Sequence, residues 1–250
     1  MVTDRLAQTV REQLRLGRLL PLGEREDGSW ITERAAAEVL GRAAAEVPDA
    51  HLGSLRIAPA DPDAVEGPAV PPPPSALPPG PLRIAAECGA TLAEPLPVTA
   101  DRLRDVLLDA AADRLGLLVE AVDIRVTEVL EELPALRHHQ PPPPPPPPPR
   151  PRPQPPPPAA GSPAPDSTAA AVGRTIASVP GVARLAPVLG SPRAVRIEGA
   201  HIRVELAVAA GHRAVDVARA VRTAVARSAP VPAPGAQPPT VAVLVTAVEP

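Results

Sequence analysis

Apolar positions in the first half of the chain switch between helical and strand spacing. A helix is predicted over 33–47, because Thr32 is a suitable N-cap and Pro48 ends the segment. Alternating apolar residues predict strands over 52–58 and 82–91. A helix with Thr99 as its cap and a Val-rich strand over 119–129 come next. The apolar face of that helix comprises Leu103, Val106, Leu107, Ala110, Ala111 and Leu115.

The second half repeats this order. A helix over 169–178 precedes a hairpin around Gly199, and a second helix over 215–227 precedes a last strand over 240–248. Both halves therefore read helix, strand, strand, helix, strand. This predicts an α+β fold of two small units that arose by internal duplication.

Proline separates the halves. The chain has 41 prolines, and the run over 141–149 predicts a polyproline II linker. At about 3.1 Å per residue, such a tract could hold the halves some 50 Å apart. The alternative is a docking peptide, with Arg150 and Arg152 giving its orientation. The expected organisation is an N-terminal amphipathic helix over 1–28, a first unit over 29–132 with a disordered loop at 59–81, a linker over 133–168 and a second unit over 169–250.

The amphipathic helix, expected from Thr3 to Leu20, combines Leu and Arg. It is interpreted as packing on its own domain, with an acidic membrane surface or a partner as the alternative.

Composition narrows the functional classes. The chain has no Phe or Tyr and one Trp, so its cores must be aliphatic. One cysteine excludes an internal disulfide, and no signal peptide or membrane span is expected, which favours the cytoplasm.

Charge is divided between the halves. Up to Gln140 there are 14 Arg against 23 Asp and Glu, a net −9, and afterwards 11 Arg against 5 acids, a net +6. Opposite charge could dock one half on the other, although both could be ordinary solvated surfaces. A basic second half also raises nonspecific nucleic-acid binding as the alternative function, but the lack of aromatics for base stacking argues against it.

Candidate chemistry is sparse. Cys88 could be a nucleophile only if His51 or His201 lay beside it, so a buried structural thiol is expected. His138 and His139 lack further ligands in a metal spacing, and Asp61 and Asp63 make a poor cation site. The residues predict no enzyme, no cofactor and no metal.

Three segments of the second half carry a family resemblance. Val179-Pro-Gly-Val182, the helix Val215–Val225 and the Val-rich last strand resemble the alkaline-shock family of envelope stress proteins of Gram-positive bacteria and actinobacteria. The first half resembles it through Val47-Pro-Asp49, the helix at 103–115 and Val122–Val126. The proline tract, the 59–81 loop and Asp49-Ala50 in place of Gly-Val depart from the pattern.

The resemblance implies a non-enzymatic cytoplasmic scaffold. Such a protein would act by self-assembly or by binding a small membrane-anchored protein, which would place it at the inner face of the membrane. The expected partner-binding residues are Arg150, Arg152, Arg219, Arg222, Leu103 and Val217.

Overall fold

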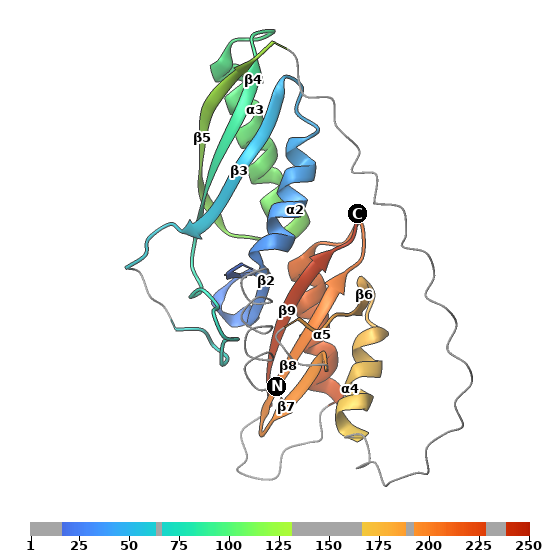
Figure 1. Ribbon diagram of the computed structural model, residues 1–250. Coiled ribbons are helices and arrows are strands. Elements are labelled where there is room, and N and C mark those ends of the chain that lie inside the picture. Colours follow the sequence, from blue (N-terminus) through green and yellow to red (C-terminus); the bar gives the residue numbers. More distant parts are fainter. Residues whose placement is uncertain (1–16, 64–66, 132–166, 189–192, 229–238) are drawn as a thin grey trace, which may run out of the picture.

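The structure is a computed structural model that describes residues 17–63, 67–131, 167–188, 193–228 and 239–250. Within these ranges the protein is an α+β fold with two sheets, one above the other in Figure 1.

The first sheet has three strands in the order β3-β4-β5. β3 pairs antiparallel with β4, and β4 pairs parallel with β5 across the helical crossover. From Leu82 to Cys88, alternate residues of β4 are buried against the helices while those between them face solvent, as in a sheet covered on one side. The elements are α2 (Glu33–Ala44), β3 (Ala50–Pro59), β4 (Leu82–Thr91), α3 (Leu96–Asp109), its π-helical continuation η2 (Ala110–Leu115) and β5 (Val119–Leu130).

The second sheet has six strands, in the order β1-β2-β9-β8-β6 with β7 also paired to β8. β7 and β8 form the expected antiparallel hairpin at Gly199, and β8 pairs parallel with β9. The elements are β1 (Leu19–Pro21), β2 (Ser29–Thr32), α4 (Ser167–Ala177), β6 (Val182–Leu185), β7 (Val195–Glu198), β8 (His201–Val208), α5 (Ala214–Ser228) and β9 (Thr240–Val248).

The two sheets share a pairing pattern. In each, one central strand pairs antiparallel with the strand that follows the first helix, β3 or β6, and parallel with the strand after the crossover helix. The second half departs from the expected helix-strand-strand-helix-strand order, because β7 is an additional strand between β6 and β8. The turns before β3 and β6 also match, because Asp49 has φ 63° and Gly181 has φ 86°. Asp tolerates this left-handed conformation better than most residues, so its presence where Gly would be expected is compatible with the same turn.

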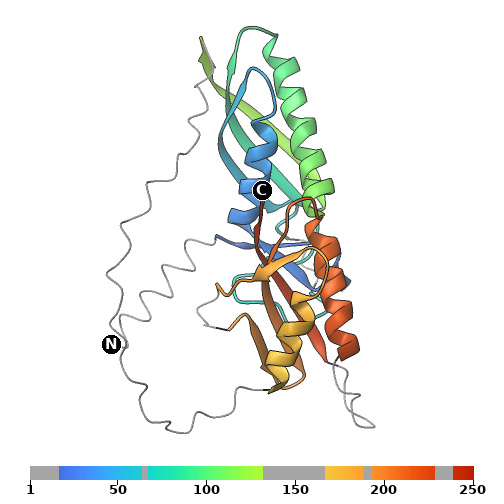
Figure 2. The ribbon, with the colours of Figure 1, turned by 90° about the vertical axis from the view of Figure 1, so that its right-hand side faces the viewer.

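Sequence reasoning missed the two short strands that connect the halves. β2 pairs parallel with β9, with Trp30 opposite Leu244. β9 is buried on both faces, since Val243 enters the main core and Leu244 packs with Trp30 in a smaller cluster. α2 packs against both β3 and β9, so one apolar core runs through both sheets. The helices α3 and α5 lie one above the other along the same side of the two sheets (Figure 2).

Several expectations are therefore corrected. The helix expected up to Leu20 gives way to β1, while 1–16 lie outside the described residues. The boundary at 28/29 divides β1 from β2, which pair. The 59–81 segment is not a disordered loop where it is described, because Val70 is buried and Leu77 N–H donates to Leu19 O at 2.8 Å.

Helix caps were predicted with mixed success. Thr32 caps α2 by accepting from Ala35 N–H at 3.2 Å, as expected. Thr99 does not cap α3, because the helix begins at Leu96 with Pro95 as its N-cap and Thr99 is buried inside it. A proline before the helix fixes the backbone where a side-chain cap was expected.

Candidate functional site

Two of the predicted partner-binding residues belong to the core. Leu103 is 0% and Val217 is 4% exposed, and both lie in the cluster that joins the two sheets. They stabilise the fold and offer no surface to a partner, which corrects the prediction. Arg150 and Arg152 lie outside the described residues.

Arg219 and Arg222 lie where the two halves meet. Arg219 makes a bidentate ion pair with Asp27, with Nε–Oδ1 at 2.8 Å and Nη2–Oδ2 at 2.7 Å. Arg222 donates to Glu26 O at 2.6 Å and to Val241 O at 3.1 Å. The Asp27 carboxylate and the Glu26 carbonyl of the acidic half therefore bind these guanidinium groups, and the Asp27–Arg219 pair joins opposite charges of the two halves.

The pKa of Asp27 is lowered. Burial raises this pKa, but the Arg219 hydrogen bonds, the Glu24 N–H and the charges of Arg219 and Arg222 together lower it more. Asp27 ends the short 3-10 helix η1 (Arg25–Asp27), and Glu24 N–H donates to its Oδ2 at 2.8 Å. This carboxylate is thus a charged link between the N-terminal strands and α5.

Close backbone contact reinforces this junction. Gly23 N–H donates to Gly116 O at 3.0 Å, and both glycines have positive φ, 78° and 84°. A Cβ on Gly116 would lie 2.2 Å from Val215 Cγ1, so only glycine fits.

Cys88 does not form a catalytic pair with His51 or His201, and His138 and His139 lie outside the described residues. Cys88 is buried on the helix-covered face, and burial raises its pKa. His51 pairs in register with Gly89 and is exposed, so it lies on the opposite face from Cys88. His201 belongs to the other sheet, where its ring contacts Thr240 Oγ1 at 2.8 Å.

Asp61 and Asp63 hold a turn of the exposed loop, in which Asp63 N–H donates to Asp61 Oδ1 at 2.9 Å. Across the described ranges, no three His, Cys, Asp or Glu side chains gather as metal ligands.

An open groove lies at the end of the three-stranded sheet that is farthest from the second sheet. It has a volume of about 630 Å³ and forms where β4 and β5 end and β3 begins. Its lining residues are Asp49, Thr91, Leu92, Ala93, Val129, Leu130 and Glu131.

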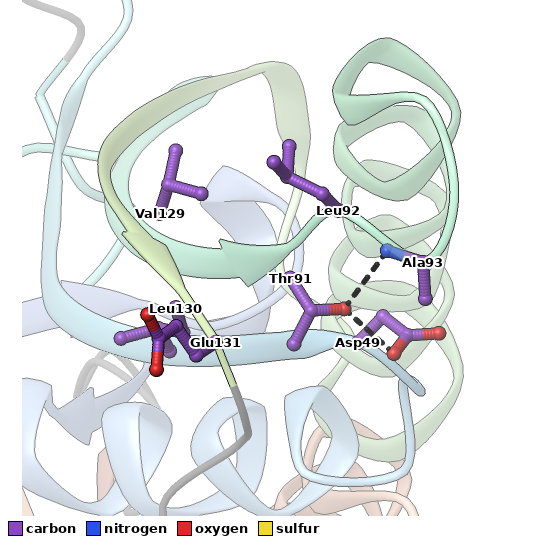
Figure 3. Close-up of a pocket in the computed structure, with 7 residues that line it drawn as sticks. All are labelled: Asp49, Thr91, Leu92, Ala93, Val129, Leu130 and Glu131. Atoms are coloured by element: carbon purple, nitrogen blue, oxygen red, sulfur yellow. Dashed lines mark hydrogen bonds between the residues drawn. The ribbon is translucent and has the colours of Figure 1, made fainter.

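Exposed apolar side chains line the upper part of this groove. Leu92 is 70% and Val129 is 53% exposed, the two highest values among the exposed large apolar residues of the described chain. Figure 3 shows both side chains above the strand ends, with Asp49 and Glu131 at the lower margins. The groove therefore combines an apolar surface with carboxylates.

A hydrogen-bonded frame holds one wall of the groove. Thr91 Oγ1 donates to Asp49 Oδ1 at 2.8 Å and accepts from Ala93 N–H at 3.4 Å (Figure 3). Thr91 N–H also donates to Asp49 O at 3.0 Å. These bonds fix the chain on both sides of Leu92, so its exposure is set by the backbone.

No protein-family model, curated protein or solved structure matches the chain. The resemblance to the alkaline-shock family consequently stays a hypothesis drawn from the sequence. In the part of the chain that the structure describes, no helix is long and apolar enough to cross a membrane.

Proposed function

We propose that this protein is a non-enzymatic interaction protein that binds a protein partner in the groove at the end of the three-stranded sheet. The observation that carries the proposal is the pair of exposed side chains Leu92 and Val129, held over a groove by a hydrogen-bonded frame. Exposed apolar groups rimmed by polar ones are typical of protein-binding sites.

The chemistry of the rim indicates the partner. Asp49 and Glu131 are carboxylates beside the apolar surface, so a segment with an apolar side chain next to Arg or Lys is complementary. Basic residues next to apolar segments are common where a chain enters a membrane from the cytoplasm. A small membrane-anchored protein fits this description, and it would hold the protein at the inner face of the membrane.

The wider assignment to envelope stress rests on the sequence resemblance. Two halves that share a central strand with an antiparallel and a parallel neighbour, and matched turns at Asp49 and Gly181, support duplication of one α/β unit. Nucleic-acid binding gains no support from the junction, because Arg219 and Arg222 bind acceptors of the protein itself.

Site-specific photo-crosslinking in the full chain tests this function. A photoreactive residue at Leu92 should give a defined adduct with one protein of the membrane fraction. The same group at Ile197, which is 38% exposed on the other sheet, is the matched control. Val129→Asp should abolish the Leu92 adduct without unfolding the protein, since Val129 is half exposed.

The absence of a Leu92 adduct would refute the groove as the site. An adduct that also forms from Ile197, or that persists in Val129→Asp, would refute it equally.

A further inference from the structure

β5 has an outer edge that no strand of the described chain pairs with, because β5 ends the order β3-β4-β5. With 12 residues it is the longest strand of the described structure. A free edge of this length can pair with another strand.

The direction of the backbone groups along β5 can be derived from its pairing. Leu82 N–H donates to Leu118 O. Leu82 and every second residue after it in β4 therefore direct their backbone N–H and C=O groups toward β5. In a parallel ladder, the residue of β5 that is the Cα partner of such a residue directs its backbone N–H and C=O groups away from β4. The register pairs Ile84 with Val122 and Ala86 with Ile124.

Val122, Ile124 and Val126 therefore present their N–H and C=O groups at the outer edge. Arg104 Nε agrees with this, since it reaches Val122 O from α3 at 3.1 Å.

The side chains between these positions carry opposite charges. Asp123 and Arg125 are on the solvent face, where Asp123 pairs with Arg83 at 2.9 Å and Arg125 lies opposite Glu87 in register. Val122, Ile124 and Val126 lie on the helix-covered face, with Val122 buried and the other two half-buried.

We propose that two copies of the chain associate by antiparallel pairing of β5 with β5, about a two-fold axis at Ile124. This register places Asp123 of each copy opposite Arg125 of the other. It also sets Ile124 against Ile124 and Val122 against Val126, with about six backbone hydrogen bonds in the ladder.

Within 121–126, where the pairing of β5 with β4 has no register shift, the charges favour this register over its neighbours. Outside that stretch the same register sets Glu120 opposite Glu128, which opposes pairing of the strand ends. A shift that centres the pairing on Asp123 sets two carboxylates against each other, and one that centres it on Arg125 sets two guanidinium groups against each other. Like charges directly opposite destabilise a strand pair, whereas opposite charges stabilise it. In the chosen register Asp123 and Arg125 also fall at a non-hydrogen-bonded pair, where side chains lie closest.

Pairing displaces one contact of the isolated chain. The Val126 N–H of the second copy replaces Arg104 at the Val122 carbonyl, and Arg104 keeps its ion pair with Asp101. The result is a continuous six-stranded sheet with the solvent faces of both copies on one side. The ladder residues 122–126 do not line the groove, so this association goes beyond the proposed partner binding.

Sedimentation equilibrium of the full chain tests the proposal. The wild type should form a concentration-dependent dimer. Asp123→Arg and Arg125→Asp should each weaken it by about tenfold or more, because both cross-strand pairs become like-charged. A mixture of the two variants should form a heterodimer, because positions 123 and 125 are both basic in one variant and both acidic in the other. Asp109→Arg, the same charge change on the exposed side of α3, should leave the dimer intact.

The register of the β5–β5 pairing is tested separately by a disulfide. Ile124→Cys should form an interchain disulfide on mild oxidation, because only this register places position 124 opposite itself within bridging distance. A wild type that stays monomeric at hundreds of micromolar overturns the proposal. So does a dimer that persists in Asp123→Arg, or a mixture that fails to associate while both variants keep a wild-type circular dichroism spectrum. Because the groove is untouched, Leu92 crosslinking should survive in Asp123→Arg whichever result is obtained.

Discussion

Removing the guanidinium of Arg219 should loosen the junction between the N-terminal strands and α5. In Arg219→Ala, Asp27 keeps the Glu24 N–H but loses both bonds of the bidentate pair. Its side chain is 12% exposed, so the unpaired carboxylate has little access to water, whereas Arg219 is 46% exposed.

The free-energy cost of Arg219→Ala should lie between the costs of breaking a fully buried and a fully exposed ion pair. Breaking a fully buried pair costs about 3–5 kcal/mol, and a fully exposed pair is worth about 0–1 kcal/mol. A nearly buried carboxylate with a half-exposed partner should cost about 2 kcal/mol of unfolding free energy.

The loss of unfolding free energy in Arg219→Ala should be larger at neutral pH than in acid. The folded-state pKa of Asp27 is lowered, so its pair stabilises the protein above the unfolded pKa of about 3.9 and ceases to do so as pH falls through the folded value. Without Arg219, the leading cause that lowers the pKa is gone, and burial then opposes only the Glu24 N–H and the charge of Arg222. The difference between wild type and variant should therefore be largest at neutral pH and shrink below about pH 4.

Urea unfolding near neutral pH and near pH 3 measures both effects. Arg227→Ala is the matched control, since it removes an exposed Arg from the last turn of the same helix. A double-mutant cycle with Asp27→Asn isolates the pair. The reasoning is refuted if Arg219→Ala costs no more than Arg227→Ala, or if the cost grows on acidification.

Three further results are expected. Gly116→Ala should lower the free energy of unfolding in urea by about 2 kcal/mol or more, because the positive φ of position 116 and the overlap of a Cβ with Val215 act together. Gly199→Ala, where φ is also positive but the space is open, should lower it by only about 1 kcal/mol. Equal losses would show that Val215 moves away from the new Cβ. Trp30 fluorescence and far-UV circular dichroism should report one coincident unfolding transition, because β2 and β9 share a sheet, and separate midpoints would contradict this. The Cys88 thiol should react with an aromatic disulfide reagent far more slowly in the native protein than in urea, since burial raises its pKa, and fast native labelling would contradict its burial.

Elements with a strong local signal were predicted from the sequence. The helix over 33–47 begins where Thr32 caps it, and the helix over 215–227 is α5. The hairpin at Gly199 and the strand over 240–248 also agree with the structure. Each has the apolar period or turn residue that its backbone requires, so local information is sufficient.

The connection between the halves had no such signal. β1 has three residues and β2 has four, too few for a period to be read. The partner of β2 is β9, more than two hundred residues away in the chain, and no local rule pairs them. The segment 67–81 was misread for the same reason, because Val70 is buried only where Trp30 and Leu244 are present.

The candidate groove was equally hidden. Leu92 in the sequence is one apolar residue after a strand, and nothing there shows whether it is buried. Its exposure is a consequence of the backbone frame of Thr91 and Asp49, two residues brought together by the pairing of β3 with β4. Conversely, Leu103 of α3 and Val217 of α5 were predicted to contact a partner, but both are buried in the main core.

The sequence by itself determined the α+β character, the aliphatic main core, the cap of α2, the hairpin turn and the opposite charges of the halves, because these depend on residue type and on spacing along a few turns or strands. Trp30 is the exception to the aliphatic packing, because it is buried in the smaller cluster. Only the tertiary structure decided that β2 joins β9, that Arg219 binds Asp27 and that Leu92 stays exposed. Those outcomes depend on which distant surfaces can bury one another, and a strand of four residues acquires its place only from the sheet that accepts it.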